Sequence, residues 1–137
     1  FILEKANYKN VTFCSWDLTP ESIQMHHKID FSHVQCLIFV IDSTDRDAIN
    51  MSREHLDIMM CYPALSKAHV LVFANKQDLP GARSADDIAK TLMLKGDNDR
   101  RCHVQGSSSL SGDGILDGLR WIFLTMKKQE KRAQSQQ

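Results

Sequence analysis

The residues of this chain best suited to chemistry are the run N-K-Q-D at residues 75–78, which directly follows an unbroken apolar stretch at residues 70–74. A short apolar run that stops at a polar residue is typical of a buried strand in a parallel sheet. The Asp78 carboxylate is therefore expected in a loop at the carboxyl edge of that sheet. There it can accept two hydrogen bonds from guanine, one from the ring N–H and one from the exocyclic amine. Adenine lacks this pair of donors, so the run predicts a guanine-binding loop, with an ordinary polar loop as the alternative.

Other side chains near that carboxylate have roles that follow from their chemistry. The Asn75 amide can tie the loop to the base, and the aliphatic stem of Lys76 can lie along the ring face. A hydroxyl-rich turn at residues 107–109 follows the next predicted strand, and the backbone N–H of Ser109 is the best placed to point at the guanine carbonyl oxygen. A plain helix-capping loop is the alternative for this turn. The predicted guanine-binding residues are Asn75, Lys76, Asp78, Ser108 and Ser109.

Strands and helices alternate along the chain, which predicts an α/β fold with a three-layer, mostly parallel sheet. Strands are predicted at residues 1–8, 11–16, 36–41, 70–74 and 102–105, the first two forming a hairpin around Lys9-Asn10. Helices are predicted after the cap-like residues 43–45, at residues 84–94 and at about residues 114–128, followed by a polar tail at residues 129–137 that is expected to fray. Ligands of such sheets lie beyond the carboxyl ends of the strands, where Asp17, Asp42, Asn75 and Ser107 fall.

The composition and charge of the chain limit the partners and the cellular setting that we expect for it. Lysine plus arginine and aspartate plus glutamate each number 17, so the formal charge is zero and nucleic acid is not an expected partner. The 4 cysteines show no spacing typical of a zinc site or a disulfide framework, which favours a reduced intracellular setting. No apolar stretch has the length of a membrane span, so a soluble, cytoplasmic protein is expected. The sequence starts with Phe1, so we expect it to begin within a longer protein or at a fragment boundary.

Several stretches resemble the ADP-ribosylation factor (Arf) family of small GTPases. They are residues 8–13 with Trp16-Asp17, residues 37–46, residues 70–80, and residues 111–114 with residues 118–121. The resemblance implies a P-loop NTPase-type small GTPase domain at residues 1–128, with residues 129–137 as a tail. It implies a GTP- and GDP-binding switch in vesicle-mediated protein transport, served by exchange factors, GTPase-activating proteins and effectors. It also implies a cytoplasmic location, peripheral to the Golgi or other endomembranes.

The first departure from the family concerns the phosphates. No G-x-x-x-x-G-K-[ST] run occurs, and the resemblance begins after the family's first strand, phosphate loop, first helix and switch I. That loop provides the N–H groups and the lysine that bind phosphates, and nearby hydroxyls bind Mg²⁺. Mg²⁺ is therefore expected only if the missing part is restored. Asp17 matches the family's magnesium-associated aspartate, and a strand-end cap is the alternative for it.

The second departure lies in switch II. After Asp17 the family usually has x-Gly-Gly-Gln, and here residues 18–21 read L-T-P-E. Thr19 and Pro20 thus fall in the phosphate-contacting segment, and Pro20 has no N–H to offer a γ-phosphate. Glu21 stands where the family has the glutamine that orients the attacking water, but a carboxylate only accepts hydrogen bonds. Whether the chain is an enzyme is left open, and a pseudo-GTPase or a fragment deficient in phosphate binding and hydrolysis is the alternative function.

Overall fold

The computed structural model describes residues 2–9, 11–17, 30–94 and 101–137, which fall into two compact units, Phe1–His33 and Val34–Gln137. In the first unit, strands β1 (Ile2–Tyr8) and β2 (Val11–Asp17) pair antiparallel, with Ile2 opposite Asp17 and Tyr8 opposite Val11. Lys9 has a φ of 52°, in the left-handed region that tight hairpin turns require. The predicted hairpin is confirmed.

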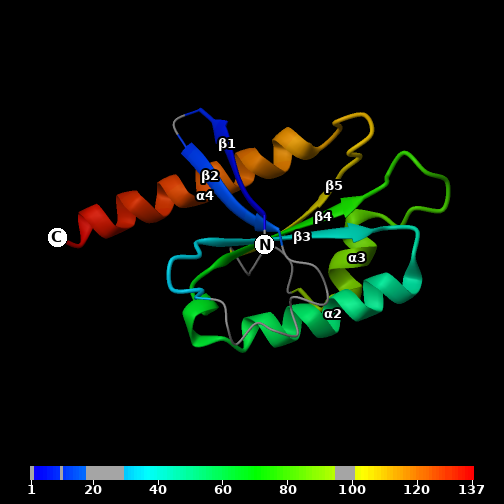
Figure 1. Cartoon of the computed structure of the whole chain (residues 1–137), viewed down its shortest axis with the longest axis horizontal. Helices are drawn as coiled ribbons and strands as arrows, with labels where there is room; N and C mark the ends of the chain where they lie inside the picture. The colour runs from blue at the N-terminus through cyan, green and yellow to red at the C-terminus, as the bar shows by residue number, and fades with distance from the viewer. Residues whose placement is uncertain (1, 10, 18–29, 95–100) are drawn as a thin grey trace. The chain divides into compact units, whose positions relative to one another are not determined.

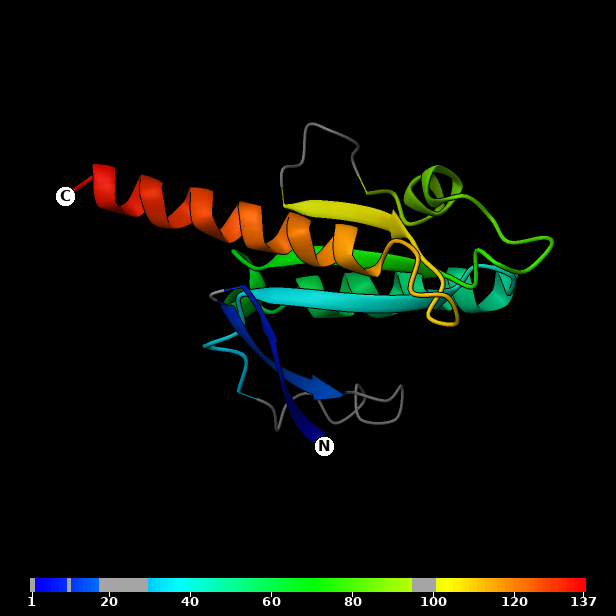
Figure 2. The same ribbon diagram turned by 90° about the horizontal axis from the view of Figure 1, so that it is seen from above.

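The second unit contains a parallel sheet whose described strands have the order β3-β4-β5. The strands are β3 (Cys36–Asp42), β4 (His69–Asn75) and β5 (Cys102–Gly106), coloured cyan, green and yellow in Figure 2. Their register places Asp42 opposite Asn75 and Ala74 opposite Gly106, so the carboxyl ends of all three strands meet at one edge. All three strands were predicted to within one residue of their bounds.

Helices cover the two faces of this sheet, as Figure 1 shows, with α4 on one side and α2 and α3 on the other. On the β4 strand, Val70, Val72 and Ala74 belong to the core cluster shared with α2 (Arg46–Met60) and α3 (Ala85–Thr91). The alternate residues Leu71 and Phe73 lie against Gly118 of α4 (Ile115–Ser135). Strand β4 is therefore buried on both faces, and the predicted three-layer α/β fold is confirmed.

The helix starts follow from local capping. The Asp45 side chain accepts hydrogen bonds from the N–H groups of Asp47 and Ala48, both at 3.0 Å, and so caps α2. Ser84 accepts from the N–H of Asp87 at 3.2 Å and caps α3. Between α2 and β4 lies one short 3₁₀ turn, η2 (Pro63–Leu65). Both predicted caps are confirmed.

Three predictions about the elements need correction. Helix α4 does not end near Lys128 but continues to Ser135, because glutamine, glutamate, lysine, arginine and alanine are good helix formers and their polarity indicates only exposure. Helix α3 ends at Thr91, not at Leu94, and Met93 beyond it has a φ of 54°. The unbroken apolar run of β3 predicts burial on both faces, but Ile38 and Val40, which share a face with Leu71 and Phe73 of β4, are 42% and 67% exposed.

Candidate functional site at the carboxyl ends of β3, β4 and β5

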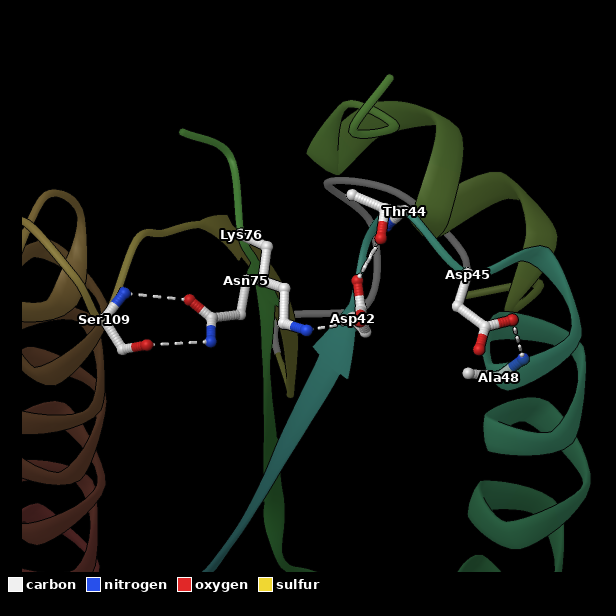
Figure 3. A network of polar contacts seen from close by, with 7 residues as sticks. All are labelled: Asp42, Thr44, Asp45, Ala48, Asn75, Lys76 and Ser109. Carbon is white, nitrogen blue, oxygen red and sulfur yellow. Dashed lines mark hydrogen bonds and ion pairs between the residues drawn. The ribbon is translucent and has the colours of Figure 1, made fainter. Parts of the chain in front are cut away.

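Asn75 joins the end of β4 to the loop after β5. Its amide Nδ2 donates to Ser109 Oγ at 3.1 Å, and its Oδ1 accepts from the Ser109 N–H at 2.9 Å. Figure 3 shows the two bonds side by side. Because one amide binds both groups of a residue 34 positions away, the two loops are held in one arrangement.

Asp78 is held by a buried serine of the same loop. Ser108 Oγ donates to Asp78 Oδ1 at 2.7 Å, and Ser108 is only 2% exposed. The Ser108 backbone is itself fixed, since its N–H donates to the Asp113 carbonyl at 2.9 Å and its carbonyl accepts from the Gly112 N–H at 2.8 Å. Asp78 lies on the solvent-exposed side of this turn. A carboxylate has about four acceptor positions, so one serine hydroxyl leaves capacity on both oxygens for further donors.

Lys76 is paired with Asp42 at the end of β3. Its Nζ lies 2.7 Å from Asp42 Oδ2, while Asp42 Oδ1 accepts from the N–H of Thr44 at 2.9 Å and from its Oγ1 at 2.7 Å (Figure 3). The hydrogen bond from Lys76, followed by those from Thr44, lowers the pKa of Asp42 to about 2. The hydrogen bond to Asp42 in turn raises the pKa of Lys76 above its usual value.

Gln77 anchors the loop after β4 through both its side chain and its backbone. Its side-chain Nε2 lies within hydrogen-bonding distance of three acceptors, Ser43 Oγ at 3.1 Å, the Ala74 carbonyl at 3.2 Å and the Arg83 carbonyl at 2.8 Å. Its backbone N–H donates to the Ser107 carbonyl at 3.0 Å. Ser43 is fully buried, and its N–H donates to the Asn75 carbonyl at 3.1 Å. Gln77 and Ser43 therefore fix the backbone that carries Asn75 and Asp78.

The structure brings together all five residues predicted to bind guanine. One detail differs from the prediction: the Ser109 N–H, expected to point at a guanine carbonyl, is donated to Asn75 Oδ1. Since one N–H can be shared by two acceptors, a base carbonyl would have to share this donor with Asn75 or displace it. Asp42 was predicted to lie at this edge of the sheet but not to pair with Lys76, and Ser43 and Gln77 were not predicted to be part of the site. For Asp42 the available signal was its place at the end of a strand.

The residues predicted to serve the phosphates are Asp17, Thr19, Pro20 and Glu21. Asp17 ends β2 in the unit Phe1–His33. Thr19, Pro20 and Glu21 lie outside the described residues. Within the described ranges, no three His, Cys, Asp or Glu side chains gather as metal ligands. The network presents amide, hydroxyl and carboxylate groups of the kind that can form hydrogen bonds with the edge of a base.

None of the helices that the structure describes combines the length and the apolar character that a membrane span needs.

Comparison with known proteins agrees with the geometry. The model of the ADP-ribosylation factor family matches residues 1–126. Among solved structures, the chain is similar to the Arl6 BBS3 small GTPase from Trypanosoma brucei, solved with a bound nucleotide analogue, GppNp. The TM-score is 0.83 at 22% sequence identity, and the match covers 93% of this chain and 80% of that one. At this identity the structural likeness shows the small GTPase fold.

Proposed function

Because this chain belongs to the ADP-ribosylation factor family of small GTPases, we propose that it binds guanine nucleotides through the network around Asn75, Lys76 and Asp78. The observation that carries the proposal is the hydrogen bond of 2.7 Å from Ser108 to Asp78. It holds an exposed carboxylate in a fixed orientation beside the Asn75–Ser109 pair.

A carboxylate held in this way selects guanine by its donors. The guanine edge presents a ring N–H and an exocyclic amine side by side, and the two Asp78 oxygens can accept both as a charge-assisted pair. Adenine presents a ring acceptor beside its amine, so it would leave one carboxylate oxygen without a donor. The Asn75–Ser109 pair belongs to the same two loops, and its Ser109 N–H could be shared with the carbonyl oxygen of the base.

At the level of the cell, we propose a molecular switch in vesicle-mediated protein transport, located in the cytoplasm and peripheral to the Golgi or other endomembranes. Exchange factors, GTPase-activating proteins and effectors are the proposed partners. The support for these proposals is membership of the family.

The variant Asp78→Asn tests the guanine assignment. Its amide offers one acceptor where the carboxylate offered two, so the preference of the chain for GDP over ADP should disappear. The loss of a charged hydrogen bond of about 1.5 to 3 kcal/mol corresponds to roughly 10- to 150-fold in affinity. The measurement is a titration with GDP and ADP up to millimolar concentration, followed by NMR.

Asp86→Asn is the matched control, because it removes the same charge from the exposed first turn of α3. It should keep the preference for GDP. Equal affinity of the parent chain for GDP and ADP would refute the guanine assignment.

A second candidate function is a pseudo-GTPase that retains the fold without nucleotide hydrolysis. The sequence L-T-P-E at residues 18–21 favours it, because Pro20 lacks the N–H and Glu21 lacks the amide that the family's Gly-Gly-Gln provides. Loss of one transition-state donor costs about 100- to 1,000-fold in rate. With an Arf-type first strand, phosphate loop, first helix and switch I fused ahead of Phe1, we expect GTP to bind and hydrolysis to remain very slow.

Reverting residues 19–21 to Gly-Gly-Gln in that fusion should restore hydrolysis. Single-turnover phosphate release from both versions is the measurement. Equal and normal rates in the two would show that residues 18–21 do not act at the γ-phosphate.

A further inference from the structure

We infer that Asp42 is a positioning residue of the guanine site, which holds the Lys76 ammonium away from Asp78 and so leaves the Asp78 carboxylate free for the base. This inference rests on the proposed function, because it concerns the affinity of the same site for guanine nucleotide. Asp42 belongs to β3, whereas Lys76 and Asp78 belong to the loop after β4.

The Asp42 carboxylate is fixed independently of the lysine. Thr44 donates two hydrogen bonds to Oδ1, at 2.9 and 2.7 Å, and the other oxygen, Oδ2, accepts from Lys76 at 2.7 Å. Because the two partners use different oxygens, the turn that contains Thr44 sets the orientation in which Asp42 receives the ammonium. Asp42 is therefore a preorganised acceptor for Lys76.

The backbone of Lys76 is also constrained. Its φ is 64°, a left-handed conformation that residues with a Cβ adopt rarely. The peptide groups on both sides are tied down, since the Asn75 carbonyl accepts from the Ser43 N–H at 3.1 Å and the Gln77 N–H donates to Ser107 at 3.0 Å. Unusual backbone conformations that the surroundings hold from several directions are concentrated at functional sites. Here the conformation directs the Lys76 side chain toward β3.

The charges of two nearby carboxylates, Asp42 and Asp78, act on the Lys76 ammonium, and its hydrogen bond is made to Asp42. Asp78 lies two residues further along the same loop, and its charge acts on Lys76 together with that of Asp42 and, more weakly, that of Asp45. An ammonium paired with Asp78 would occupy the acceptors that guanine needs. The side chains of Lys76 and Asp42 are 49% and 30% exposed, so their pair adds little to folding stability and its main effect is to place the charge.

The test uses the 137-residue chain and compares Asp42→Asn, Lys76→Met and the double variant in titrations with GDP and ADP. Asparagine keeps a side-chain oxygen for the Thr44 donors, and methionine keeps an apolar stem without the charge. We expect Asp42→Asn to weaken GDP binding by about 3- to 5-fold, the range of a partly exposed ion pair. In the Lys76→Met background the same substitution should have no effect, and the double variant should bind GDP more tightly than Asp42→Asn alone.

Asp45→Asn is the matched control. It removes a neighbouring charge that also acts on Lys76, while asparagine caps a helix as well as aspartate does. It should leave GDP affinity unchanged.

Two other outcomes would overturn the inference, and they differ in whether the proposed function also fails. If the parent prefers GDP and Asp42→Asn binds it equally well, or if adding Lys76→Met rescues nothing, Asp42 does not position Lys76 and the proposed function stands. If the parent shows no preference for GDP over ADP, the proposed function fails and the inference fails with it.

Discussion

At the scale of single residues, the site is an arrangement in which donors and acceptors are matched across two loops. Asn75 uses both ends of its amide on Ser109, and Asp42 uses one oxygen for Thr44 and the other for Lys76. Gln77 directs one amide nitrogen at three acceptors in the protein. Asp78, by contrast, has a partner in Ser108 and an exposed side with acceptor capacity left over. This difference singles out Asp78 as the group available to a ligand.

The Asp42–Lys76 pair predicts a pH dependence. The pKa of Asp42 is lowered to about 2 from the ordinary value of 3.8, so its contribution to stability is fully present above about pH 4 and is lost as the pH falls through about 2. The Lys76 hydrogen bond is the largest cause. In Lys76→Met we therefore expect the Asp42 pKa to rise toward 3.8, measured by the carboxyl ¹³C shift in an NMR pH titration.

Asp30 provides the internal control for that titration. Its pKa is also lowered, but by hydrogen bonds from Ser32, whose N–H lies 2.9 Å from Asp30 Oδ1. It should not change in Lys76→Met. An Asp42 pKa that also stayed unchanged would mean that Lys76 is not its partner in solution.

At the scale of the elements, the turn between β5 and α4 positions Ser108 and Ser109, and it depends on glycine. Gly114 is the N-cap residue before α4 and has a φ of 76°, and a Cβ built on it would overlap the carbonyl oxygen of Gly106 at the end of β5. Gly112 has a similar φ of 86°, but a Cβ there would meet nothing within 4 Å. The two glycines share the left-handed conformation and differ in the space around them.

This difference predicts unequal costs of substitution. Gly112→Ala should destabilise the fold by about 1 kcal/mol, the strain of a left-handed alanine. Gly114→Ala should cost about 2 to 4 kcal/mol, because the overlap with a backbone oxygen adds to the same strain. Urea unfolding of both variants measures the free energies. Equal losses would show that the close approach of Gly114 to Gly106 does not limit the turn.

At the scale of the whole molecule, the described network is the proposed site for a base, while the 137-residue sequence contains no G-x-x-x-x-G-K-[ST] run to hold phosphates. Backbone N–H groups, a lysine and a metal ion normally provide most of the affinity for the phosphates of a nucleotide. We therefore expect the 137-residue chain to bind GDP and GTP too weakly for calorimetry, although an NMR titration at millimolar concentration should still detect the GDP complex. Submicromolar affinity would indicate a phosphate site elsewhere in the chain.

The sequence by itself determined the features that depend on near neighbours. The unbroken apolar run 70–74 indicated β4, and the caps Asp45 and Ser84 marked the starts of α2 and α3. The run 75–78 and the serines that follow β5 identified the five residues that the structure gathers at one edge of the sheet. The strand and cap predictions held because strand periodicity and capping are local properties of the chain.

The tertiary structure alone decided how those residues are connected. The pairs Lys76–Asp42, Gln77–Ser43 and Asn75–Ser109 each join positions 34 residues apart, and they exist because the register sets Asp42 beside Asn75 and Ala74 beside Gly106. The exposure of Ile38 and Val40 likewise depends on helix packing, because they share a sheet face with Leu71 and Phe73, while α4 lies against β4 and β5. Residue types show which contacts are chemically possible. Which of these contacts form depends on how strands distant in sequence pack together, because each long-range pair requires the register of the sheet.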